Sequence, residues 1–112
     1  MRHTYREVET CATKVALGML SGKWKPIIFF HLADGAKRFT ELWRAIPRVS
    51  KKVLLEQLRQ LEEAGIVERT VHNGFPPEVT YQFTPKGAEL APILQRLDQW
   101  AMKHITGVVQ IS

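Results

Sequence analysis

The periodicity of the sequence changes within one short stretch, residues 50–71, SKKVLLEQLRQLEEAGIVERTV. Before Gly65, the residues Leu54, Leu58 and Leu61 recur at the spacing of one helix face. Gly65 suits the left-handed position at a helix C-terminus, and the β-branched residues after it predict a strand. A helix that passes directly into a strand constrains the fold strongly, because one tight turn fixes both elements.

A hairpin and a long helix are predicted after this turn. Residues 79–83 alternate apolar and polar side chains, which is typical of a second strand. The loop 72–78 between the strands contains Asn-Gly and Pro-Pro, two turn signals. Thr84 is a good N-cap and Pro85 suits the first turn, so a last helix is expected to begin there.

Three further helices are predicted upstream. Thr10 can cap the first. Residues 22–35 form the second, and its apolar run Ile27, Ile28, Phe29, Phe30 and Leu32 predicts a buried helix. Residues 38–46 form a short third that Pro47 ends. Ser50 then caps the fourth. The order helix, helix, helix, short turn, helix, hairpin, helix predicts a mainly α chain with a small β-hairpin (α+β class). This is a winged helix-turn-helix.

Composition limits the classes of function. The 112 residues are expected to form one domain, 1–112, with residues 1–9 as a polar N-terminal arm. Lys and Arg number 16 against 11 Asp and Glu, a net charge of +5 that favours a polyanionic partner, usually nucleic acid and sometimes a membrane surface. No run approaches a membrane span and no apolar signal core begins the chain, so a cytoplasmic protein without a membrane partner is expected.

No catalytic, cofactor or metal motif is visible. The four histidines do not lie at zinc-like spacing with one another or with Cys11. The sequence contains no Ser-His-Asp pattern and no glycine-rich phosphate loop. We therefore expect no enzyme, no cofactor and no metal.

The polar face of the fourth helix is predicted to enter the major groove, while the leucine face holds the helix on the domain. Glu56 either reads a base or pairs with Lys52 or Arg59 on the helix surface. The free backbone N–H groups at the helix start also favour a phosphate near Ser50. The predicted DNA-binding set is Arg38, Arg48, Ser50, Lys51, Lys52, Glu56, Arg59, Arg69, His72 and Asn73.

Specific short motifs accompany this pattern: Gly22-Lys23-Trp24, Arg38-Phe39, Glu41-Leu42, Ile46-Pro47 and Gly65-Ile66-Val67. Through them the chain, over residues 10–106, resembles the HxlR-type family of bacterial winged-helix transcription regulators, relatives of the MarR group. One departure is Arg48, where the family usually has glycine. The resemblance implies a sequence-specific regulator that represses, or in some contexts activates, a promoter.

The resemblance also implies a homodimer built from the terminal helices, and hence a palindromic operator of double-stranded DNA. The long last helix agrees, because it carries an apolar stripe that a small domain cannot fully cover. The alternative is that this stripe packs within one subunit. The predicted dimer residues are Leu90, Leu94, Leu97, Trp100 and Ile105.

Cys11 is the one cysteine of the chain. Several members of the family sense electrophiles or oxidants through a cysteine just before the first helix, and Cys11 matches that position. The alternative is a buried, inert thiol. For function as a whole, two further alternatives remain: a winged-helix protein-interaction module, and a regulator that binds a small aromatic effector non-covalently at the dimer interface.

Overall fold

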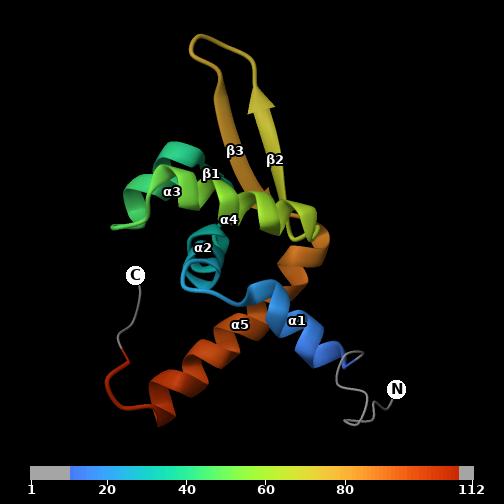
Figure 1. The fold of residues 1–112 in the computed structure, drawn as a ribbon, viewed down its shortest axis with the longest axis vertical. Coiled ribbons are helices and arrows are strands. Elements are labelled where there is room, and N and C mark those ends of the chain that lie inside the picture. Colours follow the sequence, from blue (N-terminus) through green and yellow to red (C-terminus); the bar gives the residue numbers. More distant parts are fainter. Residues whose placement is uncertain (1–10, 109–112) are drawn as a thin grey trace.

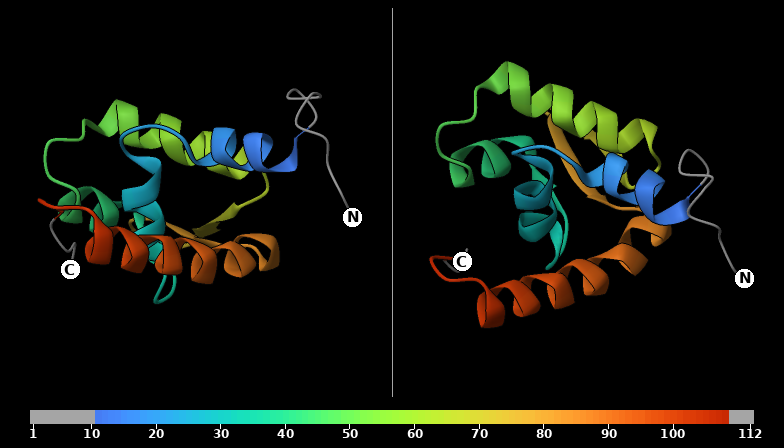
Figure 2. Two further views of the ribbon diagram at one scale, coloured as in Figure 1. Left: turned by 90° about the horizontal axis from the view of Figure 1, so that it is seen from below. Right: turned by 60° about the horizontal axis from the view of Figure 1, so that its bottom comes forward.

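The computed structural model describes residues 11–108, and the elements follow the predicted order (Figure 1). Within this range none of the helices is long and apolar enough to cross a membrane. Views from two further directions place α2 between α4 and α5 (Figure 2). The elements are α1 (Ala12–Leu20), α2 (Lys25–Leu32), β1 (Lys37–Arg38), α3 (Phe39–Ala45), α4 (Lys51–Glu63), β2 (Val67–His72), β3 (Glu78–Phe83) and α5 (Pro85–His104).

The sheet has three antiparallel strands in the order β1-β3-β2. The predicted hairpin is formed by β2 and β3, which pair from Val67 opposite Phe83 to His72 opposite Glu78. The prediction of a hairpin alone was incomplete, because β1 pairs with β3. A strand of two residues is too short to show a period, so only the paired strand reveals it.

Side-chain caps fix the starts of α4 and α5. The Ser50 hydroxyl accepts a hydrogen bond from the Val53 N–H at 3.1 Å. The Thr84 hydroxyl accepts one from the Gly87 N–H, also at 3.1 Å. Both caps stand where the sequence predicted them, and each satisfies an N–H group that the helix itself leaves free.

The first helix begins at a different residue from the one predicted. Its N-cap is Cys11, whose side chain makes no capping hydrogen bond. The prediction placed Thr10 at this position, and Thr10 lies outside the described residues together with the arm 1–9. The consequence is that the thiol itself stands at the helix start.

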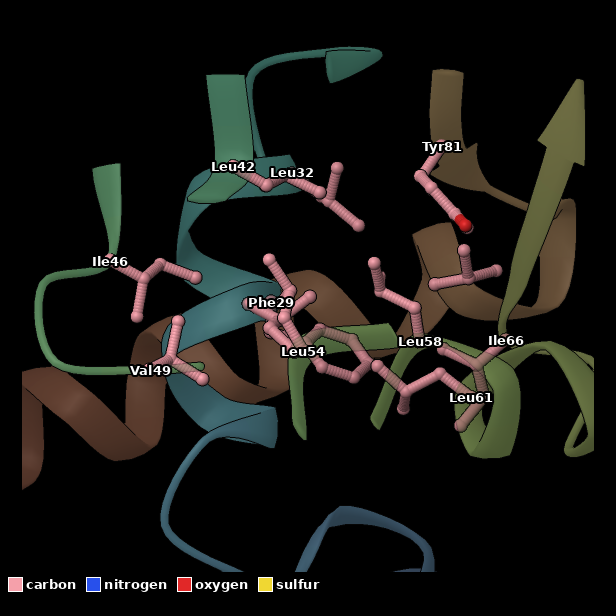
Figure 3. Packing of buried hydrophobic residues seen from close by; sticks show 12 residues of the cluster. Phe29, Leu32, Leu42, Ile46, Val49, Leu54, Leu58, Leu61, Ile66 and Tyr81 are labelled. Carbon is pink, nitrogen blue, oxygen red and sulfur yellow. The ribbon is translucent and has the colours of Figure 1, made fainter. Parts of the chain in front are cut away.

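The leucine face of α4 forms the centre of the core (Figure 3). Leu54, Leu58 and Leu61 are fully buried. They gather in one cluster with Phe29 of α2 and Tyr81 of β3 (Figure 3). Burial on this scale, about 1.5–3 kcal/mol for each large side chain, fixes which face of α4 is left for solvent.

Two polar contacts fix the orientation of α4 and of the turn before it. The ammonium of Lys25, which is buried, donates to the Gln60 side-chain oxygen of α4. The Trp43 indole N–H of α3 donates to the Val49 carbonyl at 3.1 Å. The first bond ties α4 to α2, and the second ties the turn before α4 to α3, so both contribute to the orientation of the exposed face of α4.

Candidate nucleic-acid interface

The solvent face of α4 carries a shallow, open hollow. Its lining consists of Lys51, Lys52, Leu55, Glu56 and Arg59. All five side chains are exposed. Four of them were predicted to face DNA. The fifth, Leu55, was expected to flank this surface but was not included in the predicted DNA-binding set.

The electrostatics at the start of α4 are locally unfavourable. Lys51 and Lys52 occupy the first turn, which contains no acidic residue. Cations at the positive end of a helix dipole are unfavourable by about 0.3–1 kcal/mol each. An anion bound at this end of the helix would interact favourably with both lysines and with the helix dipole. The free N–H groups of the first turn would also donate hydrogen bonds to the anion.

Arg59 is held by acidic neighbours on its own helix. One of its terminal nitrogens lies 2.9 Å from a Glu63 carboxylate oxygen, and the other lies 3.9 Å from Glu56. Glu56 therefore pairs with Arg59, one of the two partners considered for it. Exposed ion pairs of this kind contribute about 0–1 kcal/mol, so either group can exchange its partner at small cost.

The turn between α3 and α4 contains a residue in a left-handed conformation. Arg48 has a φ of 74°, and its side chain is exposed. This conformation costs a residue with a Cβ about 1–2 kcal/mol, whereas glycine adopts it freely. The backbone therefore explains why glycine suits this position, and it shows that the chain carries an arginine there at a conformational cost.

Arg38 lies at the end of β1 and immediately before α3. Its side chain is 3.1 Å from a Glu78 oxygen and 3.4 Å from a Glu41 oxygen. The hydrogen bond to Glu78 and the charge of Glu41 raise the pKa of Arg38. Arg38 can therefore reach a phosphate only by exchanging one anionic partner for another. The ion pairs of Arg38 with Glu78 and Glu41 were not predicted from the sequence.

The remaining predicted residues lie on the wing, the β2–β3 hairpin with its tip. Arg69 and His72 are exposed on β2, and Asn73 follows in the loop. The His72 ring nitrogen Nε2 lies 2.9 Å from the Thr80 hydroxyl of β3. Burial raises the pKa of Tyr81, and the neighbouring Arg69 guanidinium partly opposes this shift.

The structure thus divides the predicted residues into an α4 group, with Arg48 and Ser50 beside it, a wing group, and Arg38 on β1, which is bound to Glu78 of the wing. Figure 1 shows α4 and the wing on the side of the molecule away from α5. The basic, polar start of α4 and the projecting hairpin are therefore on the same side of the molecule.

Comparison with known proteins identifies the family. Residues 19–108 match the family model of the HxlR-like helix-turn-helix. The chain belongs to the HxlR-like helix-turn-helix family. The HTH-type transcriptional regulator YybR of Bacillus subtilis is 40% identical over 99 residues, covering 88% of this chain and 79% of YybR. The chain is therefore a DNA-binding transcriptional regulator and not an enzyme, as the sequence predicted.

Solved structures of related regulators share the fold. The reduced form of the redox regulator HypR has a TM-score of 0.82 at 38% identity, covering 86% of this chain and 95% of HypR. The reduced form of the transcriptional regulator YodB from B. subtilis has a TM-score of 0.77 at 36% identity, covering 89% and 99%. The winged helix-turn-helix prediction is confirmed.

The stripe on α5 of this HxlR-like regulator is divided in two. Leu90 and Leu94 are half-buried and pack against the core of the same chain. Leu97 and Trp100 are 55% and 56% exposed, and Ile105, at the C-cap of α5, is exposed too. The outer half of α5 therefore presents apolar side chains to solvent, and the inner half belongs to the core.

Cys11 is 8% exposed, and its sulfur is a free thiol.

A second hollow of about 300 Å³ lies between α1 and α5, with Met19, Leu90 and Ile93 in its wall and Lys86 and Glu89 beside them. Across residues 11–108, no three or more His, Cys, Asp or Glu side chains come together at a site that could hold a metal ion.

Proposed function

We propose that this regulator binds a palindromic operator as a homodimer, with α4 of each subunit in the major groove. The observation that carries the proposal is the α4 face itself. Buried leucines fix one side of the helix, and the opposite side presents Lys51, Lys52, Leu55, Glu56 and Arg59 around an open hollow. The basic start and the exposed apolar side chain suit base edges rather than a small-molecule pocket.

Each exposed group has a chemical counterpart in the major groove. Lys51, Lys52 and Arg59 can donate to guanine O6 and N7, and Glu56 can accept from cytosine N4. Leu55 can contact a thymine methyl group. Arg48, beside the helix start, would contact a phosphate, which would offset the conformational cost of its left-handed backbone.

The homodimer proposal rests on the outer half of α5. Leu97, Trp100 and Ile105 are apolar and exposed, and Val15 and Leu17 of α1 are exposed as well. Covering such side chains is favourable by about 25 cal/mol for each Å² removed from water. A second copy of the chain supplies the matching apolar surface, and its two-fold symmetry matches a palindrome.

Removal of a base-reading side chain is expected to weaken operator binding without unfolding the protein. Lys52→Ala and Arg59→Ala should each raise the Kd by roughly 5- to 150-fold, since one base contact contributes about 1–3 kcal/mol. The operator would first be isolated by in vitro selection from random double-stranded DNA with the purified chain. Binding would then be measured by fluorescence anisotropy across a salt series.

The matched control is Lys103→Ala, which removes the same charge from the far end of α5. It should change the operator Kd by less than about twofold. Circular dichroism would verify the fold of each variant. If neither Lys52→Ala nor Arg59→Ala alters the affinity, α4 does not read the operator with this face. If the native chain selects no sequence, the regulator acts through a protein partner instead.

We further propose that Cys11 is the thiol through which oxidants or electrophiles control the dimer. Cys11 is the N-cap residue of α1, so its thiol belongs to the helix start, although it makes no capping hydrogen bond. The fold is shared with HypR and YodB, and HypR is a redox regulator. Because each chain has one cysteine, a disulfide would have to join two subunits or trap a small thiol.

Treatment with diamide or a quinone is expected to change the operator Kd of the native chain by at least tenfold, and Cys11→Ser should abolish the response. Non-reducing electrophoresis and mass spectrometry would identify the product at Cys11. Equal binding before and after complete modification of Cys11 would mean that the thiol is a structural residue. A quinone effect that persists in Cys11→Ser would favour non-covalent binding, for which the hollow between α1 and α5 offers a site.

A further inference from the structure

Phe75 at the tip of the wing has no cover within its own chain. Its relative exposure is 106%, the largest of any exposed large hydrophobic residue in the described part of the chain. By contrast, buried Phe29 and half-buried Phe83 pack against each other with their ring centroids 4.9 Å apart. An aromatic ring buries about 150–250 Å² when it is covered. A partner that covers Phe75 would therefore gain substantial apolar contact.

The surroundings of Phe75 favour a polyanion as that partner. The tip residues 73–77, Asn-Gly-Phe-Pro-Pro, carry no charge. Arg69 and His72 approach the tip from β2, and the nearby carboxylate of Glu78 is bound to the Arg38 guanidinium at 3.1 Å. While Arg38 keeps Glu78 as its partner, the ring can approach DNA without bringing an unpaired carboxylate close to phosphates.

The length of the wing places its tip beyond the groove that α4 would occupy. The two paired strands have six residues each, which corresponds to a span of about 20 Å. The major groove is about 12 Å wide. Figure 1 shows the wing projecting past α4 with its tip farthest from the helices. While α4 lies in the major groove, the tip therefore reaches the neighbouring minor groove.

The tip is also stiff. Pro76 and Pro77 directly follow Phe75, and proline fixes its own φ near −65°. Pro76 also restricts the backbone of Phe75 to extended conformations. A backbone restricted in this way loses less conformational freedom when the tip is held against a partner.

We propose that Phe75 is an apolar wedge that inserts between two adjacent base pairs in the minor groove and bends the operator toward the major groove. The inference rests on the proposed operator binding and adds a DNA-deforming contact to it. The step that accepts the ring is a pyrimidine–purine step, TA or CA/TG, because such steps unstack most easily. It lies about 5 base pairs from the centre of the segment that α4 reads, half a helical turn away.

Phe75→Ala is expected to raise the Kd for the selected operator by roughly 5- to 150-fold, as alanine substitution of a base-stacking aromatic does. Phe75→Leu retains an apolar wedge and should keep most of the affinity. The bend angle, measured by energy transfer between the DNA ends, should decrease in Phe75→Ala. The slope of log K against log salt should not change, because the ring contacts no phosphate.

A direct readout is 2-aminopurine placed at the pyrimidine–purine step. The native chain should raise its fluorescence on binding, and Phe75→Ala should not. If Phe75→Ala retains the native bend, or if the fluorescence does not distinguish the two proteins, the wedge is overturned while operator binding stands. If the native chain selects no operator, the proposed function fails, and the wedge fails with it. Thermal unfolding of Phe75→Ala should match the native chain, because the ring contributes nothing to the core.

Discussion

Gly87→Ala is expected to lower the free energy of unfolding by about 3 kcal/mol and the Tm by roughly 12–24 °C. A Cβ at Gly87 would lie 2.1 Å from the Ile66 carbonyl oxygen and 3.1 Å from its Cγ2 atom. This carbonyl accepts a hydrogen bond from the Thr84 N–H at 3.0 Å. The backbone can therefore not move aside without breaking the contact that joins the start of α5 to the start of β2.

Thermal and denaturant unfolding of the DNA-free chain would measure this effect. Gly74→Ala is the matched control, since its Cβ would have the Pro76 carbonyl oxygen at 3.7 Å, an ordinary contact. We expect that control to change stability by less than about 0.5 kcal/mol. Equal stability of Gly87→Ala and Gly74→Ala would mean that the junction between α5 and β2 accommodates a methyl group.

The fourth helix could be predicted from sequence because every local signal agreed. Its cap, its leucine spacing and its terminal glycine all specify the same segment, and the structure places α4 between Ser50 and Gly65. The residues of its solvent face follow from the leucines, because burial of one face determines the other. The α4 part of the candidate interface was therefore largely accessible to sequence reasoning.

Contacts between distant residues could not be predicted in this way. Arg38 meets Glu78 across 40 positions of sequence, and β1 exists only because β3 lies beside it. The division of the α5 stripe into a core half and an exposed half also depends on where the helix lies. Such features are determined by tertiary packing, and the local hydrophobic periodicity of the sequence does not predict them.

Several residues of the candidate interface are unfavourable for the stability of the free chain. Two lysines stand at the positive end of α4, Arg48 holds a left-handed backbone, and Phe75 is fully exposed. None of these features stabilises the free chain. Each would make a favourable contact with a polyanion that has stacked bases. Departures from local consistency of this kind are expected at functional sites.

Leu97→Asp is expected to separate the proposed homodimer and to weaken binding to a palindromic operator by at least 100-fold. A carboxylate in the centre of an apolar interface loses its hydration without gaining a partner. In a dimer, the two subunits bind the two half-sites together, and this linkage raises the affinity by about 10²- to 10⁴-fold. Separated subunits bind each half-site independently and lose this gain. Sedimentation would measure the oligomeric state and anisotropy the operator affinity, at the same protein concentration.

The control for Leu97→Asp is Gln95→Asp, which places the same charge on the same helix but about 200° around its axis. Gln95→Asp should sediment as the native chain does and bind the operator with the same affinity. Leu97 is 55% exposed in the subunit and is not among the buried residues of the core, so Leu97→Asp should remain folded by circular dichroism. A Leu97→Asp variant that still sediments as a dimer would show that the outer half of α5 is not the interface. In that case, exposed apolar residues of α1 such as Val15 and Leu17 would be the next surface to mutate.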